Sequence, residues 1–144
     1  MRAEKAAELF EQGYNCAQAV SVAFCDLTGL TEKQAAMAAS SFGGGIGRQR
    51  EVCGAVSGMV LVLGMLEGYY DPQDNLGKKA QYELVQQLCG QFKEEAGSMI
   101  CREILKNPST EPTPQTRSPE YYAMRPCTRM VYLAAEILEN HLNR

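Results

Sequence analysis

Apolar residues recur with a helical period along nearly the whole chain, and this pattern restricts the fold more than any other feature. In residues 3–12, for example, Ala6, Leu9 and Phe10 fall on one face of a helix. Neither an alternating strand pattern nor an internal repeat is present. The sequence therefore predicts an all-α fold, a single-domain multi-helix bundle of about six to seven helices covering residues 1–144.

Capping and turn residues set the expected helix limits. Asn15 with Gln18, and Thr31 with Gln34, form two capping boxes that predict helix starts immediately after residues 15 and 31. Pro126 suits the first turn of a final helix. The expected helices cover about residues 3–12, 16–27, 32–42, 52–66, 75–96, 99–106 and 126–140.

Two connections stand out between these helices. Residues 107–125 contain four prolines and no regular period, so we expect a long extended loop before the last helix. A glycine-rich turn at residues 43–47 precedes the helix at residues 52–66. That helix opens with GAVSG, a spacing of small residues that lets another backbone approach closely. We therefore expect it to be the central Gly/Ala-rich helix of the bundle.

Composition excludes several functional classes. The 14 basic residues are outnumbered by 17 acidic residues and are not clustered. We therefore expect no nucleic-acid partner. The most apolar run, residues 56–66, contains two glycines and is shorter than the ~20 residues of a membrane span. The first residues, MRAEKAAELFEQG, lack the apolar core of a signal peptide. We expect a cytoplasmic protein without a membrane partner, and a homodimer stays open.

The six cysteines are unusual for this expected location, where thiols are kept reduced and act as core residues, metal ligands or redox groups. Cys25 lies late in one expected helix and Cys89 deep inside another, so both are expected to pack in the core. The other four lie at or near expected helix N-termini, where free amides and the helix dipole lower the pKa of a thiol: Cys16, Cys53, Cys101 and Cys127.

Arginines accompany three of these thiols: Arg48 and Arg50 precede Cys53, Arg102 follows Cys101, and Arg125 and Arg129 flank Cys127. Each can stabilise a nearby anion, and the alternative is an ordinary surface arginine. The glycine run matches neither a phosphate loop nor a dinucleotide fingerprint, so we interpret it as a turn that directs Cys53 into a site. The candidate cofactor-binding residues are Gly44, Gly45, Gly47 and Arg48.

Familiar local motifs are missing. The chain contains no Cys-x-x-Cys, so it predicts neither a thioredoxin dithiol nor a zinc knuckle. Ser57 lacks the two flanking glycines of a nucleophile elbow, which excludes that class of serine hydrolase. His141, the single histidine, lies near the C-terminus. A site must therefore be assembled in three dimensions from thiols on different helices.

Five segments carry a resemblance to a known family: YNCAQAV, FGGGIGR, CGAVSG, GSMIC and the last cysteine, which precedes TRMVYLAAEIL. In this order they resemble the C_GCAxxG_C_C family of redox-active proteins, from about residue 4 to about residue 140. The resemblance implies a helical protein that is redox-active or binds metal, without naming a substrate. It places the recurring cysteines at Cys16, Cys53, Cys101 and Cys127, the glycine-rich stretch at residues 43–47, and the small-residue motif at Gly54, Ala55 and Gly58. Cys25 and Cys89 are additional.

Three functions remain open. The first is thiol–disulfide chemistry in an oxidoreductase with an unidentified redox partner, and the glycine turn and Arg48 favour Cys53 as an accessible nucleophile. The second is ligation of zinc or an iron–sulfur cluster by the same four cysteines. The third is a non-enzymatic helical module with packing cysteines. A disulfide needs Cα atoms within about 7 Å, whereas a zinc site needs sulfurs about 2.3 Å from one centre.

Overall fold

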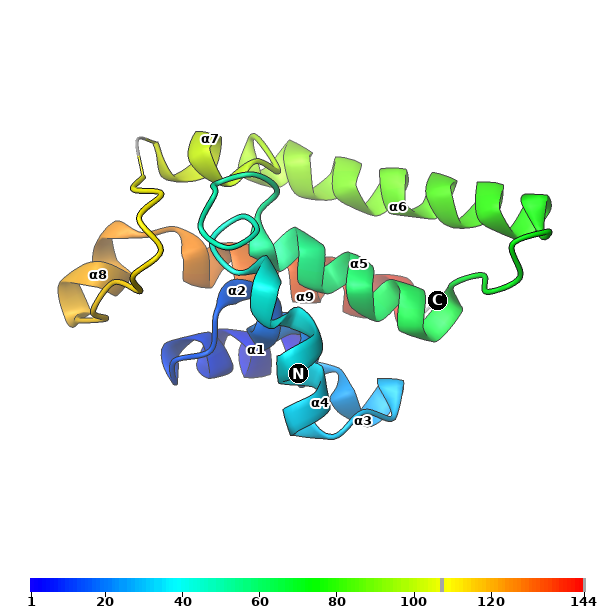
Figure 1. Ribbon diagram of the computed structural model, residues 1–144, viewed down its shortest axis with the longest axis horizontal. Helices are drawn as coiled ribbons and strands as arrows, with labels where there is room; N and C mark the ends of the chain where they lie inside the picture. The colour runs from blue at the N-terminus through cyan, green and yellow to red at the C-terminus, as the bar shows by residue number, and fades with distance from the viewer. Residues whose placement is uncertain (107, 144) are drawn as a thin grey trace.

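The structure is a computed structural model that describes residues 1–106 and 108–143 (Figure 1). These residues form helices without any strand, which confirms the all-α prediction. Their one β-bridge is isolated and joins Val52 to Ile100. The elements are α1 (Arg2–Glu11), α2 (Cys16–Ala23), α3 (Cys25–Thr28), α4 (Glu32–Ala39), η1 (Ser40–Phe42), α5 (Gly54–Glu67), α6 (Asn75–Ala96), α7 (Cys101–Leu105), α8 (Pro119–Met124) and α9 (Cys127–Leu142).

Both predicted capping boxes are formed. The Asn15 side chain accepts from the Gln18 amide at 2.8 Å, and the Gln18 side chain accepts from the Asn15 amide at 3.1 Å. Thr31 and Gln34 make the same reciprocal pair, with both distances 3.0 Å. These contacts satisfy amides that would otherwise be unpaired at a helix start. Consequently α2 and α4 begin where the sequence predicted.

The described residues contain more helices than expected because some predicted segments are divided. Phe24 leaves helical geometry (φ −112°, ψ 9°) and separates α2 from α3. Cys25 is therefore the first residue of α3 rather than a late residue of a longer helix. The helix expected to reach Phe42 ends at Ala39 and continues as the 3-10 helix η1.

One helix lies inside the expected proline-rich loop, which corrects that part of the prediction. In α8 the Ser118 hydroxyl accepts from the Tyr121 amide at 3.2 Å, and Pro119 occupies the first turn. A serine cap followed by proline is a helix-start signal that the surrounding prolines obscured. Asn107, the first residue of the expected loop, lies outside the described residues.

The small residues of α5 allow α2 to pack closely against it. A Cβ on Gly58 would lie 2.7 Å from the Ala17 carbonyl oxygen and 3.0 Å from the Val20 Cβ. A Cβ on Gly54 would lie 3.1 Å from the Cys16 Cβ. This close approach agrees with the predicted packing role of GAVSG, and it brings the start of α2 beside the start of α5.

The long helix α6 has the predicted limits and ends at Gly97, which is left-handed at φ 87°. In Figure 1 it runs beside α5, and it also contacts α9. Leu88, Cys89 and Phe92 are its buried residues, so Cys89 belongs to the core as expected. Within residues 1–106 and 108–143, no helix combines the length and apolar character of a membrane span.

The glycine-rich turn is a compact left-handed coil. Gly44, Gly45 and Gly47 have positive φ, and so do Arg48 and Arg50. The Arg50 amide donates to the Gly44 carbonyl at 3.0 Å, which closes the coil. Beyond it, the Cys53 amide donates to Met99 O at 2.8 Å, and the Cys101 amide donates to Glu51 O at 2.6 Å. These bonds fix the start of α5 against the start of α7.

Candidate functional site

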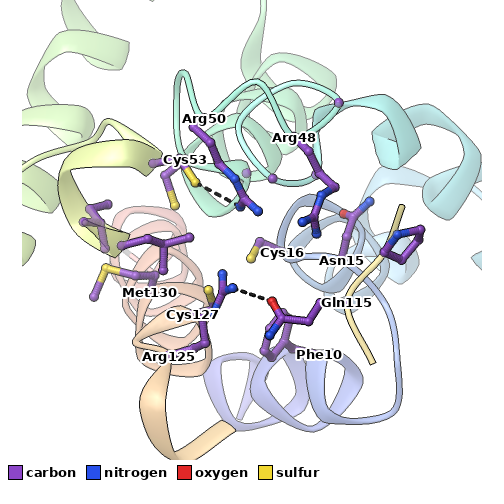
Figure 2. A pocket seen from close by; sticks show the side chains of 18 of the residues that line it. Phe10, Asn15, Cys16, Arg48, Arg50, Cys53, Gln115, Arg125, Cys127 and Met130 are labelled. Atoms are coloured by element: carbon purple, nitrogen blue, oxygen red, sulfur yellow. Dashed lines mark hydrogen bonds between the residues drawn. The ribbon is translucent and has the colours of Figure 1, made fainter. Parts of the chain in front are cut away.

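One cavity of about 390 Å³ brings together the four cysteines that the sequence placed at helix N-termini (Figure 2). Cys16, Cys101 and Cys127 are the first residues of α2, α7 and α9, and Cys53 is the N-cap of α5. All four are free thiols, as are the other two cysteines. Cys25 and Cys89 do not line the cavity. The structure therefore separates the same four cysteines from the same two.

Cys16 and Cys127 are a strongly interacting pair of thiols, because each is the first cause of the shift in the other's pKa. The interaction with Cys127, followed by burial, raises the pKa of Cys16 well above its ordinary value. The interaction with Cys16 lowers the pKa of Cys127 to about 7, helped by Arg125, Arg50 and Arg117 and opposed by burial. We assign the shared thiolate to Cys127, because guanidinium groups are among the charges that shift its pKa, whereas the charges that shift the pKa of Cys16 are those of other thiols.

Cys53 and Cys101 behave differently although they also lie at helix starts. Burial raises the pKa of Cys53 to about 12, against hydrogen bonds from the Ala55 and Val56 amides. Burial also raises the pKa of Cys101, although Arg50 Nη1 lies 3.6 Å from its Sγ. Cys53 is only 6% exposed, so the expectation of an accessible nucleophile there is wrong. Desolvation of the thiolate exceeds the helix-end effect at these positions.

Four arginines line the cavity: Arg48, Arg50, Arg117 and Arg125. Arg50 is held by a bond from Nε to Ser109 O at 2.8 Å, and Arg48 by a bond from Nε to Glu111 O at 2.7 Å. Of the other arginines predicted beside thiols, Arg102 pairs with Glu51 at 3.0 Å on the surface. Arg129 is exposed and lies outside the lining.

Of the four candidate cofactor-binding residues, three line the cavity and one does not. Gly44, Gly47 and Arg48 line the cavity, whereas Gly45 is buried in the coil behind it. A Cβ on Gly45 would lie 2.6 Å from the Glu51 amide nitrogen, so this glycine is required by the turn itself. The coil therefore contributes three of these four residues to the cavity and buries the fourth.

Sequence reasoning missed residues from α1 and from the segment before α9. Arg117 lies over the Phe10 ring at 4.3 Å and donates to Tyr14 O at 2.8 Å, which joins that segment to the α1–α2 connection. Tyr121 of α8 also lines the cavity. Neither residue is close to a cysteine in the sequence. The Ser118-Pro119 cap was the one available signal, and it predicts α8 without predicting where α8 packs.

The four cysteines also have to be tested as ligands, because they were candidates for zinc or an iron–sulfur cluster. Four thiolates about 2.3 Å from one metal have sulfurs about 3.8 Å apart. In the part of the chain that the structure describes, no three His, Cys, Asp or Glu side chains are grouped so that they could hold a metal ion. The thiols share a cavity, and ligation of a metal by all four stays a prediction.

The fold and cavity define an all-α domain in which thiols at four helix N-termini meet a group of arginines. A family model described as "Putative redox-active protein (C_GCAxxG_C_C)" matches residues 14–141. The chain therefore belongs to the C_GCAxxG_C_C family, in agreement with the resemblance in its motifs. No curated protein and no solved structure matches the chain. The family description names redox activity and no particular reaction.

Proposed function

We propose that this protein performs thiol–disulfide exchange, with Cys127 as the attacking thiol and Cys16 as the resolving thiol. The observation that carries the proposal is that the two thiols line one cavity and interact there, with the pKa of Cys127 lowered to about 7. A thiol is most effective as an attacking group when its pKa lies near the ambient pH. A second thiol in the same cavity can then resolve the first product.

The exchange uses a disulfide as the oxidant. The Cys127 thiolate attacks one sulfur of R–S–S–R, a Cys127–S–S–R bond forms, and one RS⁻ leaves and takes up a proton. The Cys16 sulfur then loses its proton and attacks the Cys127 sulfur, which forms the Cys16–Cys127 disulfide and releases the second RS⁻. Two electrons pass from the protein to the substrate, and two RSH are formed. A dithiol partner reverses the same steps and restores the reduced protein.

The interaction between the two thiols also explains how Cys16 becomes reactive at the second step. In the resting pair, the interaction with Cys127 is the largest cause that raises the pKa of Cys16. Once Cys127 is bonded to the substrate it carries no thiolate charge, so this cause disappears and Cys16 loses its proton more readily. Cys53, with its pKa near 12, stays protonated through both steps.

The test uses cysteine variants and hydroxyethyl disulfide, a neutral substrate, with intact-mass measurement. Cys16→Ser retains the attacking thiol and loses the resolving one, so we expect a mixed disulfide to accumulate on Cys127. Cys127→Ser loses the attacking thiol, so we expect the reaction to slow by about tenfold or more. Cys25→Ser, outside the cavity, is the matched control and should oxidise like the native chain. An adduct that accumulates on Cys53 or Cys101 in Cys16→Ser would contradict the proposal.

A further inference from the structure

The cavity around the thiols is strongly cationic. Arg48, Arg50, Arg117 and Arg125 line it, and none of its described lining residues is an aspartate or a glutamate. The whole chain has a net charge of −3, so the positive charge of the cavity is opposite in sign to the net charge of the molecule. Four guanidinium groups around one small cavity create a local positive potential that attracts anions.

Arg50 supplies a donor group that lacks a partner. Its side chain is only 4% exposed, and two of its nitrogens are engaged, Nε with Ser109 O and Nη1 with Cys101 Sγ. Nη2 is buried without any hydrogen-bond acceptor among the described residues. Leaving a buried donor unpaired is costly, so an acceptor from a bound molecule would satisfy it. In Figure 2 the Arg48 and Arg50 side chains point toward the Cys16 side of the cavity.

The neighbouring cations act on one another because their positive charges lie close together. The pKa of Arg48 is lowered by burial, then by Arg50 and Arg125, against smaller raising effects of Tyr121 and Glu111. Arg125 donates to the neutral Gln115 side chain and lies 5.2 Å from the Tyr121 ring centroid, so an uncharged amide and a ring surround it. The starts of α2, α5 and α9 add their partial positive charges at the same place.

We infer that the substrate of this cavity is a small anionic disulfide, whose carboxylate groups bind Arg48, Arg50 and Arg125 while its sulfurs meet Cys127. This inference rests on the proposed exchange and adds the substrate class to it. A volume of about 390 Å³ is at the lower end of the range for small-molecule pockets. Guanidinium groups bind carboxylates in a two-point geometry, which orients the ligand as well as attracting it.

The test compares three disulfides of similar length: dithiodipropionate (anionic), hydroxyethyl disulfide (neutral) and cystamine (cationic). Oxidation of the reduced protein is followed by alkylation and mass measurement. An isolated thiolate repels an anionic disulfide, so without the arginines the anionic compound reacts slowest. We expect the opposite order, with dithiodipropionate about tenfold faster than the neutral compound. We also expect this preference to shrink as salt is added.

Arginine variants identify the source of the preference. Arg48→Gln and Arg125→Gln should each lower the ratio of the anionic to the neutral rate by about tenfold. Arg129→Gln is the matched control, because Arg129 and Arg125 are both two positions from Cys127 and Arg129 lies outside the cavity. Its ratio should equal that of the native chain. The ratio is used because loss of Arg125 also raises the pKa of Cys127 and slows all three reactions.

A binding measurement that needs no variant and no reaction completes the test. Thiodipropionate, an unreactive thioether dicarboxylate, is titrated calorimetrically into the reduced native protein, and we expect saturable binding. Absence of binding at millimolar concentration, or equal rates for the three disulfides, would overturn the inference and leave the exchange intact. If none of the three disulfides oxidises the protein, the exchange itself is wrong, and the titration alone decides whether the anion site exists.

Discussion

The reactivity of each cysteine depends on what surrounds its sulfur, and its place on a helix is only one contribution. Cys53 and Cys127 both lie at the start of a long helix, yet the pKa of Cys53 is raised to about 12 and that of Cys127 is lowered to about 7. Cys53 has backbone amides as its stabilising partners, and these do not offset its burial. Cys127 interacts with the Cys16 thiol and with three guanidinium groups, and these interactions do offset its burial.

This contrast predicts how alkylation depends on pH. Only the thiolate reacts, so the rate for Cys127 should fall about tenfold per pH unit below about pH 7 and level off above it. Removing a cation disfavours the thiolate, so Arg125→Gln should shift the midpoint upward, whereas Arg129→Gln should leave it unchanged. Peptide-resolved alkylation with iodoacetamide measures both. A native midpoint close to the ordinary value of 9.0 would show that the pair does not hold a thiolate.

At the scale of the elements, the contact between α2 and α5 positions two of the four thiols. The approach is possible because α5 has glycine at positions 54 and 58, where the α2 backbone comes closest. A third glycine, Gly64, belongs to the same helix but is exposed, and nothing lies within 4 Å of where its Cβ would be. The two kinds of position should therefore respond oppositely to the same substitution.

Gly58→Ala and Gly64→Ala test this packing. The added methyl of Gly58→Ala would lie 2.7 Å from a backbone oxygen of α2, so the helices must separate. We expect a loss of about 1–3 kcal/mol in the free energy of unfolding. Gly64→Ala gains helix propensity without a clash and should be more stable by about 0.5–1 kcal/mol. Urea unfolding followed by circular dichroism measures both. Equal effects of the two substitutions would contradict the packing described here.

Most helix limits were predictable because local residues set them. The two capping boxes fixed the starts of α2 and α4, and α6 has the predicted limits of 75 and 96. The errors have local causes as well. The break at Phe24 carries no glycine or proline signal, and the cap of α8 lies among other prolines. Apolar periodicity predicts that a helix exists more readily than it predicts a one-residue interruption.

At the scale of the whole molecule, the site forms from segments that are far apart in the sequence. The four cysteines were predictable as a set, because each lies at a helix start. Their meeting in one cavity depends on contacts between elements. Examples are the hydrogen bonds from the Cys53 amide to Met99 O and from the Cys101 amide to Glu51 O. The contact made by Arg117 shows most clearly what could not be predicted from the sequence. Arg117 reaches Tyr14 O across 103 positions, and no pattern in the sequence signals that contact.

Because the site forms from distant segments, the chain needs no local cysteine motif such as Cys-x-x-Cys. A thioredoxin-type dithiol places both cysteines in one turn of chain. Here the proposed attacking and resolving thiols belong to α9 and α2, and the arginines that lower the pKa of Cys127 come from the glycine-rich coil and from the segment before α9. The chemistry therefore depends on the whole bundle, and we expect exchange activity to be lost whenever the chain unfolds.

Disulfide mapping shows whether Cys16 and Cys127 are the two thiols that exchange with the substrate. The reduced native protein is oxidised with one equivalent of hydroxyethyl disulfide, the remaining thiols are alkylated, and the peptides are identified by mass spectrometry. We expect a Cys16–Cys127 disulfide, with Cys25, Cys53, Cys89 and Cys101 alkylated. A link between any other two cysteines, or six alkylated thiols after oxidation, would contradict this expectation.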